Sequence, residues 1–111
     1  MRGAAGVPEV DVRSLSDDGF LLDVREDEEW AAGHVESAVH IGMDQLLEQI
    51  DQVPRDQAVA VICRSGGRSA QVVRYLRASG YDAVNVAGGM QAWQAAGLPF
   101  VSADGGPPQV I

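Results

Sequence analysis

The sequence predicts one α/β domain with a mainly parallel central sheet of about five strands and helices on both faces. Three observations support this prediction. The 111 residues are enough for one hydrophobic core but not for two. Short apolar runs alternate with helical patterns at short spacing, which is typical of parallel sheets. One run, Ala-Val-Ala-Val-Ile at 58–62, is apolar throughout, as expected of a strand that is covered on both faces.

The first half of the chain predicts three strands and two helices. Strands are expected at 9–12, 20–24 and 38–41. A short helix is expected at 26–32, because four acidic residues occupy its first turn, where the helix dipole favours negative charge. A longer helix is expected at 44–53, where apolar residues recur on one helical face. These residues are Leu46, Leu47, Ile50 and Val53.

The second half predicts two strands, each followed by a helix. The strand at 58–62 leads through a short loop to a helix at 69–79, which a glycine closes. A strand at 83–86 leads to a helix at 90–96, which is followed by a glycine and then a proline, a common stop signal. In open parallel sheets, ligands bind beyond the carboxyl ends of the strands. The loop after 58–62 therefore lies where a binding site is expected.

Both ends of the chain are small, polar and rich in glycine and proline. We expect residues 1–6 and 102–111 to be flexible tails around a folded domain at 7–101. No internal repeat is visible between them.

Charge and composition limit the classes of partner. The formal net charge is −8, and all eight basic residues are arginines. Such an acidic chain argues against nucleic acid or an anionic membrane as a partner. No apolar run approaches the length of a membrane span, and the first six residues are too short for a secretory signal. We therefore expect a cytoplasmic protein.

The single cysteine, Cys63, excludes an internal disulfide and a multi-cysteine zinc site, and it fits a reducing compartment. The two histidines, His34 and His40, are six residues apart and have no further cluster of ligands nearby. We expect neither a metal nor a cofactor.

The most informative segment is the loop Cys-Arg-Ser-Gly-Gly-Arg-Ser at 63–69. A free thiol is only about 3% ionised at neutral pH, so a nucleophilic cysteine needs its thiolate stabilised. The following helix points its free N–H groups and its positive dipole end at the loop. Gly66 and Gly67 allow successive N–H groups to converge on an anion, and Arg64 and Arg68 add positive charge. A buried structural cysteine is the alternative, but these neighbours favour a nucleophile.

Four segments of the chain resemble the rhodanese family of sulfurtransferases. The 63–69 loop is one. The others are Leu-Leu-Asp-Val-Arg at 21–25, Glu-Trp-Ala-Ala-Gly-His-Val at 29–35 with Ala-Val-His-Ile at 38–41, and Gly-Gly-Met-Gln-Ala-Trp at 88–93. The resemblance extends over about residues 9–100 and implies a single rhodanese-like domain.

The resemblance implies a sulfurtransferase that moves sulfane sulfur from thiosulfate or a similar donor to a thiophilic acceptor, cyanide or a thiol. Cys63 would attack the outer sulfur of the donor and become a persulfide. The loop would bind the substrate, with N–H groups at the persulfide and the two arginines at the anionic donor. The substrate-binding residues would be Arg64, Ser65, Gly66, Gly67, Arg68 and Ser69.

Loop length argues against phosphoryl transfer. Related phosphatases and arsenate reductases use Cys-x5-Arg, whereas Cys63 and Arg68 enclose only four residues. Ile62 also stands where the phosphatases have histidine.

Other functions stay open at this point. A sulfur-relay module would hand the persulfide sulfur to a specific partner protein and turn over slowly with small molecules. A catalytically silent interaction domain and a phosphatase are further alternatives. A redox switch is disfavoured, because no second cysteine could resolve a sulfenic acid within the chain. The oligomeric state is not predicted.

Several residues near the motifs have structural interpretations beside functional ones. Asp23 and Arg25 could support the loop by charged hydrogen bonds, although an ion pair that ties strand to helix is the better interpretation. The acidic run at 26–29 is expected to be solvated. For the two histidines, the family pattern favours a role in hydrogen bonds that stabilise turns. Core packing is expected for Trp30 and Trp93.

Overall fold

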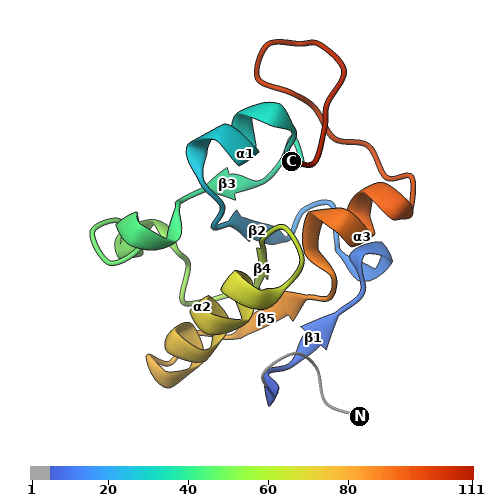
Figure 1. Ribbon diagram of the computed structural model, residues 1–111. Helices are drawn as coiled ribbons and strands as arrows, with labels where there is room; N and C mark the ends of the chain where they lie inside the picture. The colour runs from blue at the N-terminus through green and yellow to red at the C-terminus, as the bar shows by residue number, and fades with distance from the viewer. Residues whose placement is uncertain (1–5) are drawn as a thin grey trace.

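The central sheet contains five parallel strands in the order β1-β5-β4-β2-β3 (Figure 1). The computed structural model describes residues 6–111. Its strands are β1 (Glu9–Val10), β2 (Phe20–Asp23), β3 (Val39–His40), β4 (Val59–Ile62) and β5 (Ala83–Val86). Its helices are α1 (Asp27–Ala32), α2 (Gly67–Ala78) and α3 (Gly89–Ala95), with 3-10 turns η2 (Val12–Ser14), η3 (Met43–Gln45) and η4 (Ile50–Gln52). The predicted α/β class and parallel sheet are confirmed.

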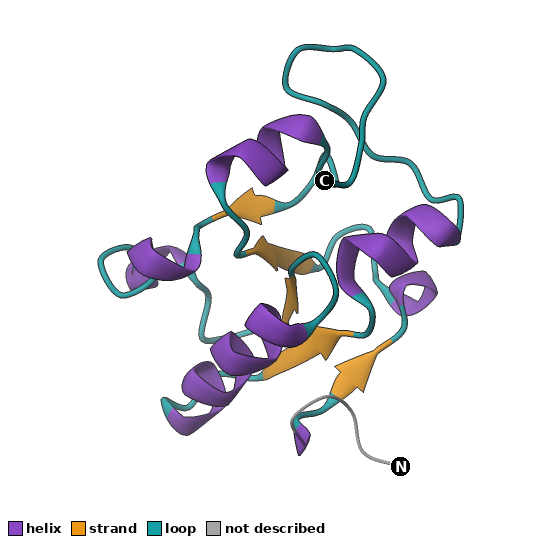
Figure 2. Ribbon diagram, in the orientation of Figure 1, coloured by secondary structure: helices purple, strands orange, loops and turns teal. Residues whose placement is uncertain are grey.

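The sheet has an apolar core on each face, as the prediction of helices on both faces requires. Side chains alternate along a strand, so neighbouring residues of β4 enter different cores. Val59 and Val61 pack with Val73 and Leu76 of α2. The other face of the strand contributes to a second cluster around α3. That cluster includes Leu21, Ala60, Ile62, Val86, Met90 and Trp93. Figure 2 shows α2 and α3 on either side of the strands.

Helix α2 begins at Gly67, two residues before the predicted start at 69. Gly66 caps it with φ = 110°, a left-handed conformation that glycine adopts without the steric cost of a side chain. The last three residues of the 63–69 loop therefore belong to the first helical turn, and the N–H groups of that turn face back toward the end of β4.

The helix predicted at 44–53 is wrong. The structure has the two short 3-10 turns η3 and η4 there. Leu46 and Val53 enter the core from these turns, whereas Leu47 is 67% exposed, so no continuous apolar helical face is formed. Pro54 follows directly and disfavours a helical backbone at Val53, which has φ = −93° and ψ = 121°.

The C-terminal segment is not the flexible tail that its composition predicted. The amide N–H groups of Ala103 and Gln109 donate to the carbonyls of Ala31 and Ala32, each at 2.9 Å. Val110 packs against the α3 cluster. The C-terminal segment is therefore hydrogen-bonded to the backbone of α1, a contact that its composition does not reveal. Of the expected N-terminal tail, residues 1–5 lie outside the described residues.

Within residues 6–111, no helix has the length and apolar character needed to cross a membrane.

Candidate active site

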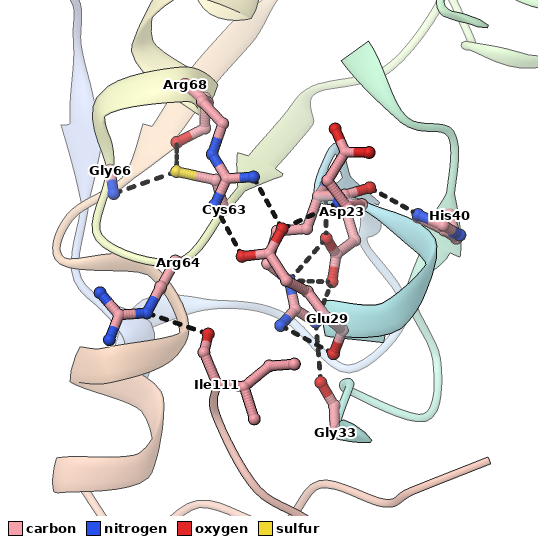
Figure 3. A network of polar contacts seen from close by, with 12 residues as sticks. Asp23, Glu29, Gly33, His40, Cys63, Arg64, Gly66, Arg68 and Ile111 are labelled. Carbon is pink, nitrogen blue, oxygen red and sulfur yellow. Dashed lines mark hydrogen bonds and ion pairs between the residues drawn. The ribbon is translucent and has the colours of Figure 1, made fainter. Parts of the chain in front are cut away.

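Cys63 lies at the carboxyl end of β4 with its sulfur enclosed by the loop that follows (Figure 3). The residue is 1% exposed. Its Sγ accepts hydrogen bonds from the backbone N–H of Gly66 at 3.1 Å and from the hydroxyl of Ser69 at 3.2 Å. The sulfur is therefore buried yet surrounded by polar donors rather than by apolar side chains alone.

These donors determine the acidity of the thiol. Burial acts to raise the pKa of Cys63, but the Ser69 hydroxyl and the N–H groups of Ser69, Gly66 and Ser65 lower it more, so that it lies below its ordinary value. Of the loop N–H groups predicted to converge on the thiol, that of Gly66 lies within hydrogen-bond distance of the sulfur. Of the two glycines, only Gly66 has a positive φ.

Asn85 of β5 connects the loop to the sheet. Its side chain is buried, accepts from the Ser69 hydroxyl at 2.6 Å and donates to the Gly66 carbonyl at 3.1 Å. The same amide donates to Glu9 of β1 at 3.0 Å. Ser69 has one hydroxyl proton and two acceptors, Asn85 Oδ1 and Cys63 Sγ. Sequence reasoning missed Asn85; a polar residue inside an otherwise apolar strand was the available signal.

Helix α1 places a carboxylate beside Arg68. Figure 3 shows Arg68 reaching from α2 to Glu29 of α1. Nη1 lies 2.7 Å from one carboxylate oxygen and Nη2 lies 2.8 Å from the other. The Arg68 hydrogen bonds lower the pKa of Glu29 to about 2. Glu29 was predicted to be a solvated helix start, but only 12% of its side chain is exposed.

Asp23 and Arg25 form a fully buried ion pair at the end of β2, with Nη2 2.8 Å from Oδ2. Arg25 also donates to the carbonyls of Glu29 at 3.2 Å and Gly33 at 2.8 Å. The pair therefore ties strand β2 to α1, as the structural interpretation predicted. Among the described residues its partners do not include the 63–69 loop. Its connection to that loop runs through α1 and the Glu29–Arg68 pair.

The remaining loop residues face outward. Arg64, Ser65 and Gly67 are exposed, and the Arg64 Nε donates to the carbonyl of Ile111 at 3.0 Å. The backbone of Cys63 and Arg64 is held from the other side by α3. Met90 N–H donates to the Cys63 carbonyl at 2.8 Å, and the next N–H of that helix donates to the Arg64 carbonyl at 3.0 Å.

The histidines form hydrogen bonds to backbone carbonyls, as predicted. His34 Nδ1 lies 2.7 Å from the Trp30 carbonyl, and His40 Nε2 lies 2.7 Å from the Arg25 carbonyl. Trp30 stacks on both imidazole rings, with centroids 3.7 Å and 4.8 Å away. Trp93 is a core residue as predicted, whereas Trp30 is only half-buried. No group of three His, Cys, Asp or Glu side chains that could bind a metal occurs in residues 6–111.

The arrangement is suited to covalent chemistry at sulfur. A thiol of lowered pKa supplies a nucleophile, and the N–H groups around it can stabilise negative charge on an atom attached to it.

Comparisons with known proteins identify the family of the chain. The family model described as "Rhodanese-like domain" matches residues 9–96. The Bacillus subtilis protein named "Putative sulfurtransferase YtwF" is 48% identical over 75 residues, which are 68% of this chain and 73% of that protein. A protein of Allochromatium vinosum named "Sulfurtransferase" is 38% identical over 106 residues, which are 89% of this chain and 99% of that protein.

A solved structure shows the same fold. The crystal structure of a rhodanese-related protein from Thermoplasma volcanium superposes with a TM-score of 0.79 at 34% sequence identity. The match covers 85% of this chain and 97% of that one.

Proposed function

Because this chain belongs to the rhodanese-like domain family, we propose that it is a sulfurtransferase that works through a persulfide on Cys63. The donor would be thiosulfate or another compound with a sulfane sulfur, and the acceptor cyanide or a thiol. The observation that supports this most strongly is the Cys63 sulfur, which is buried at the end of β4 and receives hydrogen bonds from Gly66 and Ser69.

In the first step the Cys63 thiolate attacks the sulfane sulfur of the donor. A new S–S bond forms, the bond from that sulfur to the rest of the donor breaks, and the leaving group departs with the bonding electron pair. From thiosulfate the leaving group is sulfite, and Cys63 becomes a persulfide anion. The N–H groups of Ser65, Gly66 and Ser69 would then stabilise the charge of the outer sulfur.

In the second step the acceptor attacks the outer sulfur of the persulfide. Cyanide becomes thiocyanate, or a thiolate becomes a persulfide, and Cys63 regains its thiolate. No external oxidant or reductant is required. The cycle needs a reduced Cys63, so we propose that it operates in a reducing compartment such as the cytoplasm.

The mass of the intact protein tests the proposal. Incubation with thiosulfate should add one sulfur atom, and cyanide should then remove it. Cys63→Ser should retain the fold and gain no sulfur. Absence of any gain in the parent protein, with thiosulfate and with an organic persulfide, would contradict the proposal.

Turnover separates the enzyme from a sulfur relay. Fast production of thiocyanate from thiosulfate and cyanide would favour the enzyme. A persulfide that forms but reacts slowly with every small acceptor would favour transfer to a specific partner protein.

A further inference from the structure

We propose that Glu29 determines which sulfur donors the site accepts. By neutralising Arg68, it favours donors with at most one negative charge, such as organic persulfides and thiosulfonates, over the thiosulfate dianion. This inference rests on the proposed sulfurtransferase function and specifies its substrate class.

The Glu29–Arg68 contact occupies the part of Arg68 that would bind an oxyanion. Each terminal nitrogen of the guanidinium contacts a different carboxylate oxygen, at 2.7 and 2.8 Å. This is the paired geometry by which a guanidinium also binds a sulfonate. A donor can therefore use this face of Arg68 only by displacing Glu29.

Several contacts fix Glu29 in this position. Its Oε1 also accepts the backbone N–H of Glu26 at 2.9 Å, in a capping box at the start of α1. Its carbonyl accepts from Arg25, which is buried in its pair with Asp23. Because the pKa of Glu29 lies at about 2, its carboxylate stays charged at neutral pH. Rotation of the Glu29 side chain would break these hydrogen bonds, and its protonation is unfavourable at neutral pH. Release of Arg68 therefore costs free energy.

The charges around the sulfur leave no net positive charge once Glu29 is counted. Arg64 and Arg68 supply two positive charges, while Glu29, Glu26 and the Cys63 thiolate supply three negative ones. Arg64 is exposed, and its Nε already donates to the carbonyl of Ile111. A dianionic donor thus meets a site with no net positive charge, on a chain whose formal charge is −8. Electrostatic repulsion opposes the binding of a donor with fewer negative charges less strongly.

Thiosulfate and methanethiosulfonate provide a matched pair of donors. Both contain a sulfane sulfur bonded to an oxidised sulfur, but a methyl group in the second replaces one charged oxygen. Cys63 would attack the sulfane sulfur of methanethiosulfonate, the S–S bond of the donor would break, and methanesulfinate would leave with the electron pair. The persulfide formed is the same from both donors.

The experiment compares kcat/KM for the two donors, with cyanide as the acceptor, in the parent protein, Glu29→Gln and Glu28→Gln. Glu28 is an exposed neighbour on α1, so its variant removes the same formal charge without touching Arg68. We expect Glu29→Gln to raise kcat/KM for thiosulfate about tenfold relative to methanethiosulfonate, chiefly through a lower KM. Glu28→Gln should change that ratio by less than about twofold.

Two results would overturn the inference. One is an unchanged donor ratio in Glu29→Gln, or an equal change in Glu28→Gln. The other is a parallel loss of activity with both donors in Glu29→Gln, which would make Glu29 a support of the loop. Both differ from failure of the proposed function, in which neither donor adds sulfur to Cys63.

Salt dependence provides a second measurement that needs no variant. Since the site has no net positive charge and the chain is acidic, kcat/KM for thiosulfate in the parent protein should not decrease between low and high ionic strength. A steep decrease with salt would show that unneutralised positive charge attracts the donor, and would also overturn the inference.

Discussion

Gly89 lies directly against the carbonyl group of Cys63, so that a side chain at position 89 would overlap the oxygen of that carbonyl. The N–H of Met90 donates to the same oxygen at 2.8 Å. The start of α3 and the end of β4 are thus packed backbone to backbone, and the position of the nucleophile depends on a glycine 26 residues away in the sequence.

Gly89→Ala should reduce sulfur transfer at least about tenfold, because the loop at Cys63 must shift to accept the methyl group. The matched control is Gly97→Ala. Gly97 also has a positive φ, at 72°, but a Cβ there meets nothing within 4 Å. The control should lose about 1 kcal/mol of stability from backbone strain and keep its transfer rate. Thiocyanate production and thermal unfolding of both variants measure this. Equal transfer rates in Gly89→Ala and Gly97→Ala would show that the contact between Gly89 and the Cys63 carbonyl does not position Cys63.

Ser69→Ala should raise the pKa of Cys63, because it removes a hydrogen bond to the sulfur. A higher pKa lowers the thiolate fraction most at low pH, so the variant should lose more activity at pH 6 than at pH 8.5. The pH dependence of Cys63 alkylation measures the shift directly. Ser79→Ala, at the other end of α2, is the control and should leave the titration unchanged. A titration of the Ser69 variant identical to that of the parent would contradict the assigned cause.

Glu29 should stabilise the fold at neutral pH but not in strong acid. Its folded-state pKa of about 2 is below the ordinary value of 4.5, so the stabilisation is present above 4.5 and is lost as the pH falls through about 2. After allowance for solvent screening we expect about 1 kcal/mol. Urea unfolding of the parent protein and Glu29→Gln at pH 7, 4 and 2.5 tests this. A difference between them that did not shrink toward pH 2.5 would be inconsistent with it.

Removal of one partner of the Asp23–Arg25 pair should destabilise the protein by about 3–5 kcal/mol, because the other charge would be left buried without compensation. Asp23→Ala measured by urea unfolding tests this. Arg13→Ala is the contrasting variant, since the Asp11–Arg13 pair is exposed on both sides and this change keeps the Asp11 cap of η2. Its loss should cost less than about 1 kcal/mol. A similar cost for both variants would mean that burial does not govern the contribution of the buried pair.

Arg68→Ala should raise the KM for thiosulfate more than that for methanethiosulfonate. The substitution removes a positive charge and leaves the Glu29 carboxylate without its two hydrogen bonds beside the site. Steady-state kinetics with both donors measure the effect. Equal increases of KM would show that Arg68 acts only on the conformation of the loop.

The sheet and its active-site loop could be predicted because local patterns specify them. The apolar run at 58–62 is typical of a covered strand, and the glycines and arginines after Cys63 indicate an anion-binding turn. The helix predicted at 44–53 failed because Leu46 and Val53 reach the core from two separate 3-10 turns while Leu47 is exposed, which the apolar periodicity does not reveal. The C-terminal tail was mispredicted because its partners, Ala31 and Ala32, are distant in the sequence.

The sequence by itself determined the fold class, the place of Cys63 at the end of a parallel strand and the donors nearest to it, because these depend on residues adjacent in the chain. Only the tertiary structure placed Asn85 under the loop, Gly89 against Cys63 and Glu29 on Arg68. The residues of each pair are 19, 26 and 39 positions apart. Such contacts arise only when parallel strands bring the loops at their carboxyl ends together, and no local pattern in the chain specifies which side chains then meet.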